Sequence, residues 1–323
     1  MESVDVADSK STAKAQGSAQ VRHVIRRQFT CRFFMSSYAY HFKQLVPQKC
    51  PFGTTPHVVE PKCPGVVERY IDLSGFYDRT GLQPLKEQIL DATAEYQGHY
   101  KRVYRCLGAA GELRRDLNEL LADESVRHKL AKRAAGIISR ELKKPGGSGQ
   151  ESQRFLSAVT HQGLVTLWET VEAQANRVYE LADSYGLAHD LLNPILTAAL
   201  AAGHRAIVCP DPMAPDRLAH LIFPDLSLAF VTSAGEAPWP HHAYRRLRLD
   251  AMADAEACRA NRPRLRFTRK VAAALVDEGV AALTQAKQAH DRLEQLYNPH
   301  VDFSGVTTLA DQLADQVLSL NRI

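Results

Sequence analysis

The feature that most constrains the fold of this chain is a strand-like segment followed at once by a turn and a helix. Residues 176–181 have a β-type pattern, and residues 190–202 repeat apolar side chains at helical spacing. This order predicts an α/β fold, in which a parallel sheet is covered by helices. The expected strands are residues 177–181, 205–209, 220–223 and 227–232. We expect the first of them to be central and to run parallel to the second.

The turn between that strand and helix lies where a phosphate-binding loop (P-loop) would lie. A P-loop reads G-x-x-x-x-G-K-[ST]: its glycines let backbone N–H groups approach phosphate, its Lys bridges the outer phosphates and its hydroxyl holds Mg²⁺. Here Asp183 and Ala188 replace the two glycines, and His189 and Asp190 replace the Lys and the Ser or Thr. Gly186 is retained within the turn. The candidate site residues are therefore Gly186, His189 and Asp190, at the positions of a degenerate phosphate loop.

The charges of this turn oppose nucleotide binding. Asp190 stabilises a free helix N-terminus by about 0.3–1 kcal/mol, but it would repel a triphosphate. His189 is mostly neutral at pH 7, because an unperturbed histidine has a pKa of about 6.5. Asp183 adds a further negative charge. We expect no efficient ATP hydrolysis here; the alternative is an atypical ATPase that binds ATP with Mg²⁺.

The remaining sequence predicts no catalytic residue and no metal site. Asp211 follows an apolar run as a Walker B aspartate does, but its proline neighbours make it a turn residue. Cys50, His57 and Cys63 lack a fourth ligand and the spacing of a zinc site. Residues 241–242 are adjacent histidines, whose side chains rarely converge on one ion. No cofactor is therefore assigned from the sequence.

Composition places the chain among globular proteins. It is 45% hydrophobic and 24% charged, with a formal net charge of +4. No stretch is long and apolar enough to cross a bilayer, and residues 1–20 contain no apolar run typical of a secretory signal. Six scattered cysteines without a C-x-x-C motif are typical of reduced thiols. We therefore expect a cytoplasmic protein without a membrane partner.

Two basic segments are the candidates for nucleic-acid binding. Residues 21–52 interleave arginines with aromatic side chains, and residues 245–270 form the densest run of arginines. Such segments can follow a phosphate backbone. For residues 21–52, an amphipathic helix that packs on a core is the favoured interpretation. Acidic residues accompany the second segment, which favours a solvated helix surface over a nucleic-acid site. Binding through residues 245–270 is kept as an alternative function.

Shifts in composition divide the chain into four parts. A polar tail is followed by a mainly helical region, a glycine-rich linker and the α/β core, which carries a helical hairpin and a last helix. The expected bounds are 1–20 for the disordered tail, 21–144 for the helical region, 145–153 for the linker and 154–323 for the core, with the hairpin at 263–297 and the last helix at 305–320.

Four segments, at residues 55–65, 104–114, 155–165 and 221–233, resemble bacterial tandem P-loop ATPase-like proteins of unassigned role. The resemblance covers roughly residues 54–320. It implies two halves, each a P-loop NTPase-like core with long helical-hairpin additions. On this basis residues 21–144 are the remnant of the first repeat, whose core is missing, and the second half carries the degenerate loop.

The resulting expectation is a degenerate P-loop ATPase-like protein with a structural or protein-interaction role. Its partner would be another protein of unknown identity.

Overall fold

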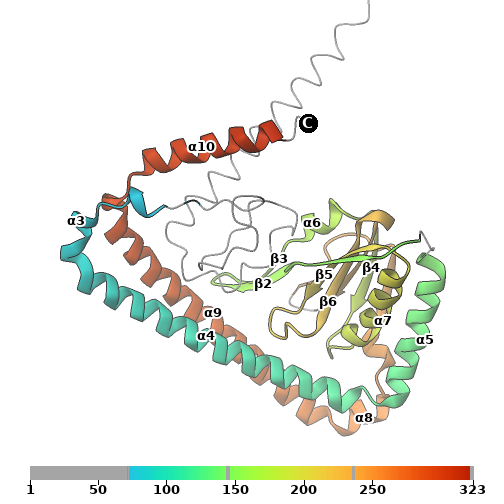
Figure 1. Ribbon diagram of the computed structural model, residues 1–323. Helices are drawn as coiled ribbons and strands as arrows, with labels where there is room; N and C mark the ends of the chain where they lie inside the picture. Colours follow the sequence, from blue (N-terminus) through green and yellow to red (C-terminus); the bar gives the residue numbers. More distant parts are fainter. Residues whose placement is uncertain (1–70, 72, 143–145, 235–236, 321–323) are drawn as a thin grey trace, which may run out of the picture. The chain divides into compact units, whose positions relative to one another are not determined.

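The computed structural model describes residues 71, 73–142, 146–234 and 237–320 (Figure 1). The tail expected at residues 1–20 and the basic–aromatic segment 21–52 lie outside the described residues, as do Cys50, His57 and Cys63. The chain divides into two compact units: residues 94–289 form the larger, and the chain on either side of them forms the smaller. The described part of residues 21–144 is mainly helical, as predicted.

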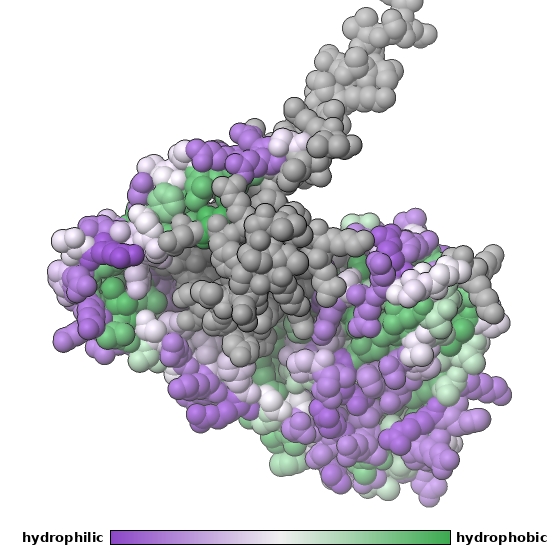
Figure 2. All heavy atoms as spheres, in the orientation of Figure 1, coloured by the Kyte–Doolittle hydropathy of each residue, from purple (hydrophilic) through white to green (hydrophobic). Residues whose placement is uncertain are grey.

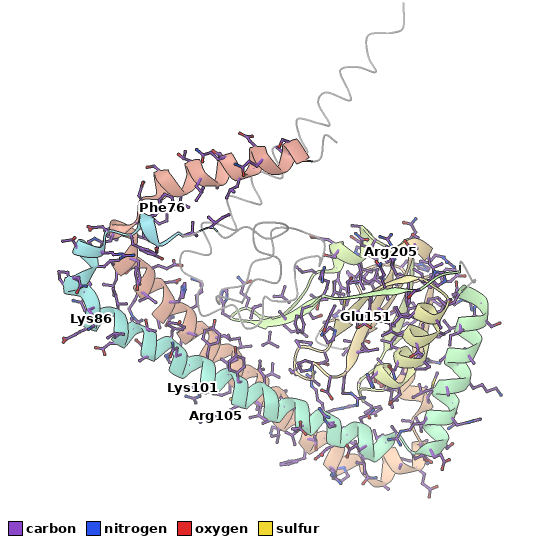
Figure 3. All side chains as sticks on the ribbon, in the orientation of Figure 1. Phe76, Lys86, Lys101, Arg105, Glu151 and Arg205 are labelled. Atoms are coloured by element: carbon purple, nitrogen blue, oxygen red, sulfur yellow. The ribbon has the colours of Figure 1, made fainter. Side chains whose placement is uncertain are left out.

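The larger unit has an α/β fold built on a six-stranded sheet. The order across the sheet is β1-β5-β6-β7-β4-β8. The strands are β1 Gln150–Gln153, β4 Arg177–Ala182, β5 Arg205–Pro210, β6 Leu218–Phe223, β7 Leu228–Ser233 and β8 Arg245–Arg248. A separate hairpin pairs β2 Ser157–Thr160 with β3 Gly163–Thr166. The linker expected at residues 145–153 thus includes β1, which lies beside β5; Glu151 and Arg205 mark these two strands in Figure 3.

The sheet is mixed, which corrects the expectation of a parallel sheet. β4 is parallel to both of its neighbours, but β6 is antiparallel to β5 and to β7. β4 and β5 therefore run in the same direction, as expected, with β6 and β7 between them. β4 was expected to be central, but it lies next to the edge strand β8. The physical reason is the short connection from β6 to β7, which consists of η3 Pro224–Leu226 and Ser227. So short a link can join only antiparallel strands, whereas parallel strands need a long crossover.

Each face of the sheet packs against a different set of elements. α7 Ala188–Ala201 and α5 Glu124–Glu141 cover one face, together with apolar side chains that include Tyr179 and Phe230. α6 Trp168–Glu172 and the segment at residues 237–243 cover the other face, where Trp239 belongs to one buried cluster with Val178 and Val231. The alternation along β4 explains this division, since neighbouring residues of a strand point to opposite faces.

Two long helices complete the larger unit. α4 is one helix over Lys86–Leu121, and α9 is one helix over Arg262–Tyr297, preceded by η4 Leu249–Met252 and the short α8 Ala255–Ala260. The hairpin expected at residues 263–297 was therefore wrong, because no proline or capping sequence interrupts that segment after its first turn. Within this unit the two helices are joined by an ion pair of Arg102 with Glu278, 2.6 Å apart. Lys101 and Arg105 of α4 are exposed (Figure 3).

The smaller unit joins the segment before α4 to the end of the chain. Its elements are η1 Ser74–Phe76, α3 Arg79–Leu82, η2 Gln83–Leu85, η5 Asn298–His300 and α10 Phe303–Leu320, with the adjoining ends of α4 and α9. Tyr77 forms an isolated bridge with Val301, and the N–H of Asp78 donates to the carbonyl of His300 at 2.8 Å. The helix predicted at residues 305–320 is confirmed as α10 and begins two residues earlier.

Candidate functional site at the turn between β4 and α7

The predicted strand, turn and helix occur in the larger unit as β4, residues 183–187 and α7. Gly186 lies in the turn at the carboxyl end of β4, and its φ of 76° is a backbone conformation that favours glycine. The local prediction from the sequence is therefore confirmed. Hydrogen bonds within the turn determine what its backbone can bind.

Asp183 occupies the turn with its own side chain. Its Oδ1 accepts a hydrogen bond from the N–H of Tyr185 at 3.0 Å, and its Oδ2 accepts one from the N–H of Ala188 at 2.7 Å. The side chain is buried. Burial raises the pKa of the Asp183 carboxyl, although N–H groups of Ala188, Leu187 and Tyr185 lower it. Backbone donors that a phosphate would use at such a turn are thus bonded to an internal carboxyl group.

Three further side chains hold the turn from outside. Asn118 of α4 donates to the carbonyl oxygens of Tyr185 and Gly186, at 3.3 and 3.1 Å. Arg217 donates through Nη2 to the carbonyl of Gly186 at 2.8 Å. The Oδ1 of Asp250 accepts from the N–H of Ser184 at 2.7 Å. Because the turn is bonded from several directions, we expect it to be rigid.

α4 approaches this region closely at one glycine. A Cβ on Gly111 would lie 2.5 Å from the carbonyl oxygen of Met213, in the segment between β5 and β6. That oxygen belongs to the backbone and cannot move aside easily. Gly111 therefore allows α4 to contact the β5–β6 segment and to bring Asn118 onto the turn.

His189, predicted at the position of the P-loop lysine, is held as a neutral ring. Its Nδ1 accepts a hydrogen bond from the N–H of Leu218 at 3.0 Å. Burial and the charge of Arg217 lower the pKa of His189, while Asp190 and Asp216 partly offset this effect. In the neutral ring with Nδ1 as acceptor, the proton is on Nε2, so His189 offers a hydrogen-bond donor.

Asp190, at the position of the Mg²⁺-binding hydroxyl, is half-buried in the first turn of α7. Its Oδ2 is buried and accepts no hydrogen bond from the described residues. Gly186 and His189 line the cavity beside the turn, whereas Asp190 is absent from its described lining. The structure thus brings together two of the three predicted site residues.

That cavity has a volume of about 380 Å³ and lies within the larger unit. Its wall comes from the turn, α4, α9, the β2–β3 hairpin, the β5–β6 segment and the end of β7. The polar lining residues central to its chemistry are Asn118, Asp183, His189, Asp211, Arg217 and Arg269. The sequence did not place Arg217 and Arg269 in one site, since they are far apart in the chain and only the fold unites them; Arg269 was considered only as part of the basic segment 245–270.

A buried Ser157–His220 pair also lines the cavity, and it was missed in the sequence. Ser157 Oγ is 3.4 Å from His220 Nε2, and His220 Nδ1 accepts from the N–H of Thr232 at 3.1 Å. This places the proton of the neutral ring on Nε2, so His220 donates to Ser157 and cannot accept its proton. The pair therefore lacks the arrangement of a nucleophile activated by a base.

The other sequence candidates have structural partners. Asp211 accepts from the N–H groups of Met213 and Ala214, at 2.7 and 3.3 Å, which confirms the turn prediction. His241 pairs with Glu172 at 2.5 Å, and Arg246 of the basic segment lies 3.4 Å from Glu180. The surface around α8 is mostly hydrophilic (Figure 2).

One cluster of metal-ligating types occurs among the described residues, in the smaller unit. His290, Asp291 and Glu294 place one ligand atom each within 4.8 Å of one another. They come from little more than one turn of α9, and His290 Nδ1 lies 3.3 Å from Glu294. Three ligands from one helix face leave a coordination shell incomplete, so no metal is assigned.

Comparisons with known proteins found no match to this chain among family models, curated proteins or solved structures. Among the described residues, no helix combines the length and apolar character needed to cross a membrane.

Proposed function

We propose that this chain is a degenerate P-loop ATPase-like protein, without efficient ATP hydrolysis, that has a structural or protein-interaction role. The observation that carries the proposal is the side chain of Asp183, which accepts hydrogen bonds from the N–H groups of Tyr185 and Ala188. A nucleoside triphosphate would need these donors at a loop of this kind.

Displacing Asp183 would be costly. Its carboxyl group is buried, and a buried polar group that loses its partners costs about 1–3 kcal/mol, or more when charged. The displaced group would also lie beside the incoming phosphate. These effects oppose the binding of ATP before any catalytic step is considered.

The two positions after the turn add to this effect. His189 is a neutral ring whose Nδ1 is bonded to the backbone of Leu218, so it does not replace a permanently charged lysine. Asp190 supplies a carboxyl group in place of the hydroxyl that would bind Mg²⁺. A cytoplasmic location is part of the proposal, because Cys106, Cys209 and Cys258 are free thiols and thiols stay reduced in the cytosol.

The test is isothermal titration of Mg-ATP into the wild type and into repaired variants. We expect no binding to the wild type and little to His189→Lys with Asp190→Ser, because Asp183 still occupies the turn. Adding Asp183→Gly should free the backbone donors and create measurable affinity. The matched control adds Asp211→Gly instead, which removes another lining aspartate that accepts two backbone N–H groups.

Two outcomes would contradict the proposal. Micromolar binding of Mg-ATP to the wild type would favour the alternative of an atypical ATPase. A folded triple variant without affinity would show that the turn is not a phosphate-loop relic. If Asp183→Gly prevents folding, Asp183→Ala also removes the oxygens that accept from the turn and adds less backbone freedom than glycine, and circular dichroism identifies the folded variants.

Nucleic-acid binding through residues 245–270 is the remaining alternative. Four of its arginines have partners within the protein. Arg246 lies near Glu180, and Arg245 lies over the ring of Tyr244 at 5.5 Å. Arg259 donates to the carbonyl of Ala255, and Arg269 lies over the ring of Tyr185. Binding to single-stranded DNA that weakens steeply with salt would favour this alternative.

A further inference from the structure

The cavity beside the turn lies between two neighbouring strands whose following segments pass to opposite faces of the sheet. β4 and β7 are parallel neighbours, and both contribute their carboxyl ends to the cavity wall. The chain leaves β4 through α7, on one face, and leaves β7 through the segment containing Trp239, on the other. Ligands of open α/β sheets bind at such switch points, outside the carboxyl ends of the strands.

The charged lining of this cavity is mainly cationic. It contains Arg114, Arg115, Arg217 and Arg269 but, among acidic side chains, only Asp183 and Asp211 in the described lining. Both aspartates direct their oxygens at backbone N–H groups of their own turns. They therefore do not neutralise the arginines directly.

Arg217 and Arg269 retain the capacity to bind an anion. Among the described residues Arg217 donates one hydrogen bond, from Nη2 to the carbonyl of Gly186, although a guanidinium has five N–H groups. Arg269 lies over the ring of Tyr185, with its Cζ 4.8 Å from the ring centroid. Among the described residues, the contacts of these two guanidinium groups are with a carbonyl and an aromatic ring, and not with a carboxylate. Arg115, by contrast, pairs with Asp216 at 3.1 Å.

His189 supplies an uncharged donor on the same wall. Its Nδ1 is bonded to the backbone, so Nε2–H is the group left to donate. Another part of the lining is apolar and includes Leu117, Leu164, Met213 and Ala272. A ligand that satisfies both parts combines an anionic group with a small apolar body.

We propose that this cavity binds a small organic anion, a carboxylate or a phosphate monoester, whose anionic group is held by Arg217 and Arg269 with His189 as an additional donor. The cavity volume of about 380 Å³ is within the range of small-molecule sites. Charge-assisted hydrogen bonds from a guanidinium are the strong contacts in such a site. The site uses side chains only, so it does not need the backbone donors that Asp183 occupies.

The test compares three probes with one apolar body: benzoate, phenyl phosphate and uncharged benzamide. Binding to the full chain is measured by saturation-transfer NMR and by thermal shift at fixed ionic strength. We expect at least one of the two anions to bind and benzamide to bind at least tenfold more weakly. The stronger of the two anions then identifies the anionic group of the ligand.

Variants locate the binding. Arg217→Gln and Arg269→Gln should each weaken binding of the anion about tenfold, while Arg217→Lys should recover part of the loss. Arg264→Gln is the matched control, since Arg264 is an exposed residue of α9 outside the described cavity lining. Arg269 contacts the turn through the side chain of Tyr185 and not through its backbone, so its variant remains informative if Arg217→Gln does not fold.

Three outcomes would overturn the proposal: neither anion binds, benzamide binds as well as the anions, or folded Arg269→Gln binds as the wild type does. These outcomes are separate from the Mg-ATP titration. Micromolar ATP binding would contradict the proposed function, whereas loss of anion binding on Arg269→Gln concerns this cavity alone.

Discussion

Protonation of His220 should destabilise the fold, because the ring is buried and uses Nδ1 as an acceptor. The residue is 4% exposed, and its Nδ1 accepts from the N–H of Thr232 at 3.1 Å. Burial lowers the pKa of His220 from 6.5 to about 4. A proton on Nδ1 would place a charge in the core and break that hydrogen bond.

The sign of the effect follows from the lower pKa in the folded state. The unfolded chain binds the proton first as the pH falls, so the contribution is fully present above pH 6.5 and is lost as the pH falls toward 4. At 1.36 kcal/mol per pH unit, the full interval corresponds to roughly 3 kcal/mol of unfolding free energy. About 2 kcal/mol of this should be lost by pH 5.

Urea unfolding at pH 7.5, 6 and 5 measures this loss in the wild type and in His220→Asn. The carbonyl of Asn can accept the N–H of Thr232 but does not titrate, so the variant should lose about 2 kcal/mol less between pH 7.5 and pH 5. Other titrating groups are common to both proteins and cancel in the comparison. Equal losses in the two proteins would refute the reasoning, since they would mean that His220 takes up its proton without penalty.

Two further substitutions test the structure around the turn and the sheet. Gly186→Ala should lower the unfolding free energy by about 1–2 kcal/mol, because Gly186 has a positive φ. The control Gly108→Ala should raise the unfolding free energy by about 0.5–1 kcal/mol, because Gly108 lies in α4 with open space around it. Urea unfolding measures both changes. Glu141→Gln should lower the unfolding free energy by about 1–2 kcal/mol in the same assay, because it weakens hydrogen bonds from Arg177 and Tyr179, each 2.5 Å long. An unchanged unfolding free energy at pH 7 would show that these hydrogen bonds make no net contribution to stability.

The local elements near the site were predictable because their patterns are short-range. Apolar spacing placed β4 and α7, and it also placed the strands at residues 220–223 and 227–232. The direction of β6 was not predicted, although the short link at residues 224–227 carried the signal. β8 was missed because its sequence, Arg-Arg-Leu-Arg, is polar and lacks the apolar pattern of a buried strand. An exposed strand at the edge of a sheet can have such a polar sequence.

The long helices show the limit of reading breaks from single residues. Gly98 and Gly108 are residues at which a helix could break, yet α4 continues through both. A helical glycine costs about 1 kcal/mol, which tertiary packing of a long helix can offset. The cavity could not be predicted at all, because its arginines come from α4, α9 and the β5–β6 segment, and only packing of the larger unit brings them together.

Asp183 shows why the sequence could identify the turn but not its chemistry. Aligned with a P-loop, Asp183 counts as a lost glycine and a repulsive charge. In the structure, the chain reverses through Gly186 and the Asp183 oxygens reach the N–H groups of Tyr185 and Ala188. The same turn can therefore present its donors to an external anion or satisfy them internally, and residue spacing does not distinguish these cases. The direction of the Asp183 side chain distinguishes the two cases, and only the folded turn defines that direction. Asp183→Gly within the repaired variant is therefore the decisive substitution. If it creates ATP affinity, the turn is a phosphate loop occupied by Asp183; if it does not, the turn is unrelated to a phosphate loop.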